Sequence, residues 1–136
     1  MKTRFFLDPP QDVDFTVLAI NSHAKGYKLC WQINRKLQVS FEKKEDHNIQ
    51  NKMWFARYTY ICEEGNEYNL LANRSKKGYL VPNQKSINYF LIVKKKVLEE
   101  KKKELIYKLK TTKDILFVFE INTSLIKKIE RLVLND

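Results

Sequence analysis

The side chains that could perform covalent or metal chemistry are few and widely separated in this sequence. There are two histidines, His23 and His47, and two cysteines, Cys30 and Cys62. A metal site needs several such ligands at short, regular spacing, and His47 has no second histidine or cysteine within that reach. We therefore predict no metal site, a solvated His47 and two buried, unpaired thiols, with a disulfide or metal pair as the alternative for the cysteines.

The motifs of common enzyme classes do not occur in the sequence either. No serine lies in a Gly-x-Ser-x-Gly elbow, and three glycines in the whole sequence are too few to form a glycine-rich phosphate-binding loop. Nearly all acidic residues lie beside lysines or in polar turns, whereas acid–base catalysts use carboxylates in apolar settings. These patterns predict a protein without catalytic residues or a cofactor.

Positive charge is concentrated in one segment that has the periodicity of a helix. Residues 94–113 contain nine lysines and three glutamates, a net of +6 out of +10 for the whole chain. Lysine ammonium groups neutralise phosphates, and an exposed tyrosine ring can stack on a base. The residues proposed for nucleic-acid contact are Lys95, Lys96, Lys103, Tyr107 and Lys110. The alternative is a solvated helix face in a lysine-rich proteome.

The elements that position these side chains follow from hydrophobic periodicity. Six strands are predicted, over residues 14–20, 39–43, 53–62, 67–72, 87–93 and 115–121. Three helices are predicted, over residues 24–37, 97–113 and 123–134. The order β-α-β-β-β-β-α-β-α indicates an α+β fold, a mostly antiparallel five- or six-stranded sheet with three helices packed on it. A ferredoxin-like βαββαβ core with an inserted hairpin is one arrangement that fits.

The connecting segments and two charged residues add detail to this fold. Residues 46–52 are polar and predict a turn, whereas the long loop at 73–86 contains an apolar stretch, Tyr79–Val81. Lys102 falls on the apolar side of its helix. We therefore expect either that its side chain extends along the apolar surface to bring the ammonium to solvent, or that the first turn of the helix is frayed. Glu120 lies in an apolar strand, which an edge position would explain.

Length and composition indicate one domain. The 136 residues, 43% of them apolar, suffice for a core without disulfides or metals, and residues 1–12 are expected to form a poorly ordered arm. No apolar run approaches the roughly 20 residues of a membrane span. The apolar triplet Phe5–Leu7 is too short for the core of a signal peptide. We therefore expect a cytoplasmic protein without a membrane partner.

One stretch of the loop and the following strand has a recognisable signature. Its residues are Val81, Pro82, Asn83, Ile87, Asn88 and Tyr89. With this segment the chain resembles the IPExxxVDY family, a group of small proteins of Bacteroidota. Further residues that resemble the family are Phe15, Ile20, Ser22, Tyr27, Leu29, Cys30, Trp31, Asn34 and Asn73–Ser75. The resemblance implies a shared fold and lends no activity.

The chain departs from that signature at both acidic positions, where Asn83 and Asn88 replace Glu and Asp. An amide keeps the shape and hydrogen-bonding capacity of an acid but lacks its charge and basicity. We therefore interpret the segment as structural. Pro82 rigidifies the loop entry, and side chains 83 and 88 are expected to hydrogen-bond locally around it.

Taken together, these patterns favour a non-enzymatic domain that binds a protein partner or a second copy of itself as a homodimer. Exposed sheet edges and the stretch Tyr79–Val81 are the expected interfaces. The alternative function is nucleic-acid binding through the lysine-rich helix at 94–113.

Overall fold

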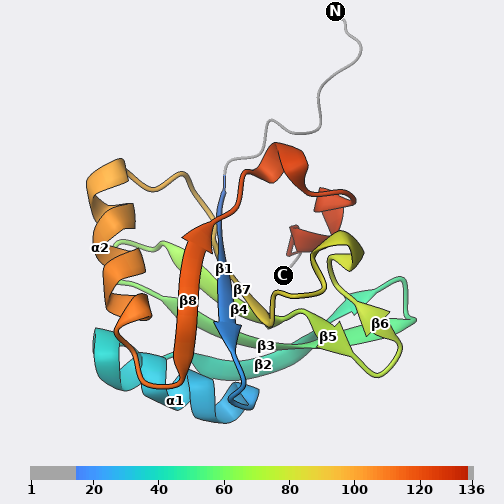
Figure 1. Ribbon diagram of the computed structural model, residues 1–136, viewed down its shortest axis with the longest axis horizontal. Coiled ribbons are helices and arrows are strands. Elements are labelled where there is room, and N and C mark those ends of the chain that lie inside the picture. Colours follow the sequence, from blue (N-terminus) through green and yellow to red (C-terminus); the bar gives the residue numbers. More distant parts are fainter. Residues whose placement is uncertain (1–14, 135–136) are drawn as a thin grey trace, which may run out of the picture.

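The computed structural model describes residues 15–134 and confirms an α+β fold, in which a six-stranded antiparallel sheet carries two α-helices (Figure 1). The strands of this sheet are β1 (Thr16–Ser22), β2 (Glu42–Ile49), β3 (Met53–Ile61), β4 (Glu67–Ala72), β7 (Tyr89–Val93) and β8 (Ile115–Glu120). The helices are α1 (Gly26–Leu37) and α2 (Glu99–Lys110). A small separate hairpin consists of β5 (Arg74–Ser75) and β6 (Gly78–Tyr79). The arm predicted for residues 1–12 lies outside the described residues.

The strands follow the order β2-β3-β4-β7-β1-β8, and every neighbouring pair is antiparallel. Strands β1 and β4 are therefore parallel with β7 between them, and β7 and β8 are parallel with β1 between them. Helix α1 lies in the first of these connections and α2 in the second. Two interlocked split βαβ units result, which is the ferredoxin-like arrangement. The β2–β3 hairpin is an insertion after α1 that widens the sheet.

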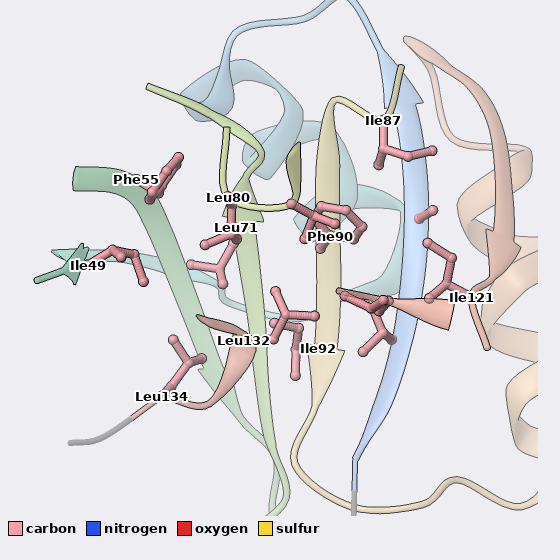
Figure 2. Packing of buried hydrophobic residues seen from close by; sticks show 14 residues of the cluster. Ile49, Phe55, Leu71, Leu80, Ile87, Phe90, Ile92, Ile121, Leu132 and Leu134 are labelled. Carbon is pink, nitrogen blue, oxygen red and sulfur yellow. The ribbon is translucent and has the colours of Figure 1, made fainter. Parts of the chain in front are cut away.

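The two faces of the sheet bury separate apolar clusters, because successive side chains of a strand point to opposite faces. On the helix face, α1 and α2 pack Leu29, Ile33 and Leu109 onto the strands. On the opposite face, which we call the loop face, Leu80 and Leu132 cover the sheet (Figure 2). The strand residues beneath them include Phe55, Leu71, Phe90 and Ile92. Strand β7 is covered on both faces, so all five of its residues are buried.

Helix α1 approaches the sheet closely at its first residue. A Cβ atom at Gly26 would lie 2.8 Å from the hydroxyl oxygen of Tyr58, which is closer than Cβ atoms normally approach another heavy atom. A larger residue here would have to displace the Tyr58 side chain, which favours glycine at a position where helix propensity alone disfavours it.

The predicted strand at 39–43 and turn at 46–52 are placed too early in the chain, because the strand covers Glu42–Ile49 and the turn only residues 50–52. Strand β2 continues to Ile49, and the chain turns at Gln50 and Asn51, which both have positive φ values (53° and 55°). The side-chain oxygen of Asn48 accepts a hydrogen bond from Asn51 N at 2.8 Å and stabilises this turn. Because β2 is an edge strand and largely exposed, its polar composition reflects contact with solvent rather than a loop.

The predicted third helix, over residues 123–134, is also wrong. This segment forms two short 3-10 helices, η2 (Thr123–Leu125) and η3 (Ile129–Leu132). Lys128 adopts a left-handed conformation with φ of 59°, which interrupts any continuous helix between them. The segment crosses the loop face and buries Ile126, Leu132 and Leu134 there. Burial on the sheet thus overrides a helical apolar pattern, and Leu125 from that pattern is exposed.

The loop at 73–86 is organised rather than irregular. It contains β5, β6 and a 3-10 turn, η1 (Pro82–Gln84). Leu80 and Val81 are completely buried in the loop-face cluster. The prediction that Tyr79–Val81 forms an exposed interface is therefore wrong, because this stretch closes the protein's own core.

Candidate functional site

A groove of about 500 Å³ lies on the helix face, between α2 and the paired ends of β3 and β4. Leu91 of β7 and Leu105 of α2 contribute apolar lining, and so does Leu37 at the end of α1. The groove therefore has a hydrophobic lining where the two helices leave part of the sheet open. Its volume is in the range of small-molecule and cofactor sites.

Three aromatic rings form one wall of the groove. Tyr60 and Tyr68 are directly opposite each other in β3 and β4, and their ring centroids are 5.8 Å apart. The ring of Phe41 lies 5.6 Å from that of Tyr60. Asn34 holds Phe41 in place, since its side chain accepts from Phe41 N at 2.7 Å and donates to Phe41 O at 3.1 Å. The three rings form a continuous row.

The hydroxyl of Tyr68 in this row is neutral at physiological pH. Burial raises the pKa of Tyr68 above its usual value of 10, and Cys62, Tyr60 and Glu64 raise it further. The half-buried rings of Tyr60 and Tyr68 can stack on a planar ligand, and the buried ring of Phe41 supports that of Tyr60.

Lysines form the opposite wall. Lys95 and Lys96 come from the connection between β7 and α2, and Lys101 and Lys108 lie two turns apart on α2. The only acidic side chains in this lining are Glu64 and Glu104, so four lysines and two glutamates give a net charge of +2. The groove is therefore cationic on one side and aromatic on the other.

The structure divides the five residues predicted to contact nucleic acid into two groups. Lys95 and Lys96 line the groove. Lys103, Tyr107 and Lys110 are exposed on another side of α2 and do not belong to that lining. The five side chains therefore do not form one site, although each lies in or beside α2.

Sequence reasoning missed Lys101 and Lys108 and the three rings. Lys101 and Lys108 are seven residues apart, which places them on one side of a helix. Lys103 and Lys110 have the same spacing, and only the rotation of α2 about its axis shows which pair faces the groove. The strand predicted over residues 53–62 contains Tyr60 but does not indicate its neighbours. Its proximity to Phe41 and Tyr68 depends on strand pairing, which the sequence did not specify.

The family-signature segment is held together by Asn73, which is completely buried. Its side-chain nitrogen donates to Gln84 O and Ile87 O, both at 2.9 Å, and its side-chain oxygen accepts from Val81 N at 2.9 Å. Its backbone also pairs with Leu80 and Asn88. Every hydrogen-bonding atom of this amide is therefore used to shape the loop, and none is available to a ligand.

Within the signature segment, the two asparagines that replace acids behave differently. The side-chain oxygen of Asn88 accepts from Ser22 N at 2.8 Å, whereas Asn83 is exposed in η1. The adjacent Tyr89 donates its hydroxyl to Ala24 O at 2.6 Å, and burial raises its pKa to about 12. Val81 and Ile87 are buried, and Pro82 begins η1. These contacts support a structural role for the segment, with Asn88 rather than Asn83 as the local hydrogen-bonding residue.

The residues considered for metal or thiol chemistry lie in different elements, with His47 in β2, Cys30 in α1 and Cys62 directly after β3. Within residues 15–134, no group of three or more His, Cys, Asp or Glu side chains is placed to hold a metal ion. His47 is half-buried, and its Nε2 lies 2.6 Å from Arg131 O, so it is less solvated than predicted. Cys30 is buried, and burial raises its pKa while Asn34 lowers it. Cys62 is also unpaired but only half-buried, because it lines the groove.

A second hollow, of about 740 Å³, lies between β2, β3 and the C-terminal segment. Its lining mixes Glu45, Asp46 and Glu130 with Arg57 and Arg131. With Lys128 also in the lining, three acidic and three basic residues balance, so the formal charge of the surface favours neither an anion nor a cation.

Comparisons with known proteins give no family for this chain. No family model matches it, and no curated protein matches it. The resemblance to the IPExxxVDY family stays a prediction that rests on the signature residues. No helix in the described part of the chain combines the length and the apolar character that crossing a bilayer requires.

Proposed function

We propose that this protein is a binding domain that holds single-stranded nucleic acid in the groove between α2 and the β3–β4 ends. The observation that carries the proposal is the row of Phe41, Tyr60 and Tyr68 facing a wall of lysines. Proteins that bind single strands combine these two features, because rings stack on bases while lysines neutralise the backbone.

The geometry favours a single strand over a duplex. The rings lie inside a groove rather than on a protruding surface, and they can be reached only by bases that are not already paired. Stacking contributes about 1–3 kcal/mol per base, so one or two bases in the groove would supply a large part of the affinity.

The proposed role is binding rather than catalysis. It places the protein in the cytoplasm, where single-stranded nucleic acid is present and the thiols of Cys30 and Cys62 stay reduced. The low number of lysines in the groove predicts modest affinity that depends on salt. With up to four phosphates neutralised, log K should fall with log salt concentration with a slope of about −3.

The test is fluorescence anisotropy with labelled single-stranded RNA, single-stranded DNA and duplex DNA at two salt concentrations. The variant Lys101→Glu with Lys108→Glu reverses two charges in the groove and should weaken single-strand binding by about tenfold or more. The matched control is Lys103→Glu with Lys110→Glu, which changes the same net charge on the same helix outside the groove. Tyr68→Leu should also weaken binding, since it removes a stacking surface but keeps an apolar side chain.

Equal loss of binding in the two double variants would contradict the proposal, because it would show that only total charge matters. Absence of single-strand binding at low salt would also contradict it. A preference between RNA and DNA would identify the ligand class within the proposal.

A further inference from the structure

The two edges of the sheet differ in how well they are protected against pairing with another strand. The β2 edge is charged from Glu42 to Asp46, and its ladder with β3 is interrupted between Lys44 and His47. Charges and bulges of this kind prevent edge-to-edge association. The β8 edge instead carries apolar side chains, namely Leu116, Phe117 and Phe119, which are 61%, 47% and 37% exposed.

The outer side of β8 is open within the described part of the chain, since β8 is the last strand of the sheet order. Figure 1 looks toward this edge, with β8 in front and α2 beside it. The one irregularity in its pairing with β1 lies at Asn21 and Ser22, near the start of β8. The rest of the strand, from Phe117 to Glu120, is regular and can accept a further strand.

The hydrogen-bond pairing of β8 with β1 determines which backbone groups of β8 point away from the sheet. Ile121 N donates to Val17 O at 3.0 Å, which marks residue 121 as facing β1. Residues of an antiparallel strand alternate between the two neighbours, so Phe119 and Phe117 also face β1. The N–H and C=O groups of Val118 and Glu120 therefore point away from the sheet.

Apolar side chains lie on one side of this edge. Phe119 is directly opposite Ala19, a member of the loop-face cluster, so Phe117 and Phe119 point to the loop face. Their rings stack with centroids 5.7 Å apart. A strand added to β8 would place every second side chain against this exposed pair.

Positive charge lies on the other side of the same edge. Lys102 faces the sheet and bonds to Glu120 of β8, while Lys101 and Lys108 face the groove. At 100° per residue, Lys103 and Lys110 lie on the side of α2 opposite to the groove, which is the side toward the free edge of β8. Both are exposed. The remaining side chains of an added strand would lie beneath these two lysines.

We propose that the β8 edge binds an extended segment of an acidic partner protein, in which apolar and acidic residues alternate, as an added strand of the sheet. The backbone supplies the pairing, Phe117 and Phe119 receive the apolar residues, and Lys103 and Lys110 attract the acidic ones. A second copy of this chain fits less well. Twofold pairing of β8 with itself would bring Lys103 and Lys110 of both copies together, and like charges repel.

The test uses two short labelled peptides, one alternating valine with glutamate and one alternating valine with lysine, in an anisotropy titration. The glutamate peptide should bind about tenfold or more tightly than the lysine peptide, since charge complementarity selects between them. Lys103→Glu with Lys110→Glu should reverse this preference, and both positions are exposed, so the fold should persist. Phe117→Ser with Phe119→Ser should weaken both peptides, with a melting curve as the check on folding.

The matched control, Lys101→Glu with Lys108→Glu, should leave the peptide preference unchanged, because these lysines face the groove. The same control weakens nucleic-acid binding in the proposed function, so failure of one proposal is separable from failure of the other. The inference would be overturned if the two peptides bound equally well, or if the two double lysine variants changed peptide binding to the same extent. A dimer in sedimentation that Phe117→Ser dissolves would overturn it in favour of self-association.

Discussion

The ammonium of Lys102 lies 3.0 Å from both carboxylate oxygens of Glu120, so a buried lysine of α2 forms an ion pair with the edge strand β8. Glu99, one turn earlier in α2, also accepts from this ammonium at 3.0 Å. The contact explains why a lysine occupies the apolar side of the helix. The same rotation of α2 separates the groove lysines from those near the β8 edge.

The Lys102–Glu120 pair should make stability sensitive to alkaline pH. The hydrogen bonds that Lys102 donates to Glu120 and Glu99 raise its pKa above 10.5, so the folded protein holds this proton more tightly than the unfolded chain does. That stabilisation is present below pH 10.5 and is lost as pH rises through the raised pKa. Glu120→Gln should lower the free energy of unfolding at pH 7 by about 1 kcal/mol, because Glu120 is partly exposed. Urea unfolding at pH 7 and 11.5 measures both effects, with the exposed Glu100→Gln as control.

The signature segment should tolerate change at Asn83 but not at Asn88. Asn88→Ala removes the acceptor for Ser22 N, which links β7 to the end of β1, and should lower the free energy of unfolding by about 1–2 kcal/mol. Asn83→Ala alters an exposed side chain and should change it by less than about 0.5 kcal/mol. Thermal melts of the two variants make the comparison, and equal effects would refute the assignment of the structural role to Asn88.

Tyr89 should ionise only at strongly alkaline pH. Burial, with a smaller contribution from Tyr58, raises its pKa to about 12. The unfolded chain ionises this tyrosine near pH 10, so its contribution to stability is complete below pH 10 and is lost as pH rises toward 12. Tyr89→Phe should remove that part of the pH dependence and lose the hydrogen bond to Ala24 O. Ultraviolet difference titration checks the pKa, and Tyr107→Phe, at an exposed tyrosine, should show neither change.

The two thiols should differ in reactivity, and a bound ligand should protect only one of them. Cys30 is buried with a raised pKa, whereas Cys62 is half-buried in the groove wall. A thiol reagent should therefore modify Cys62 first, since the thiolate is the reactive form and must be accessible. Single-stranded nucleic acid should slow this reaction if it occupies the groove. Mass spectrometry of the native protein over time follows both thiols, and faster labelling of Cys30 would count against the structure of this region.

Several parts of the fold could be predicted because their signals are local. The strand at 53–62 alternates side chains with a period of two, and 97–113 repeats its leucines with a helical period, so β3 and α2 occur where the sequence places them. The segment over residues 123–134 has an equally good helical period and is not an α-helix. Its apolar residues gain more from contact with the loop face than from continuing one helix, and that contact is not visible in a local pattern.

The candidate site was predictable only in part for the same reason. The lysine content of residues 94–113 is a property of the sequence, and it correctly identifies a cationic region. Which lysines share a groove is decided by the rotation of α2 on the sheet, which buries Leu109 and brings Lys102 to Glu120. The aromatic wall arises from three separate segments, because Phe41 is placed by Asn34 and the two tyrosines by the pairing of β3 with β4.

By itself, the sequence determined the α+β class, most of the strands and both α-helices, since these depend on the periodicity of neighbouring residues. The tertiary structure alone decided the course of the C-terminal segment, the grouping of the lysines and the difference between the two sheet edges. Those features depend on which surfaces meet, and burial of apolar area between distant segments outweighs the fraction of a kcal/mol per residue by which local propensities differ.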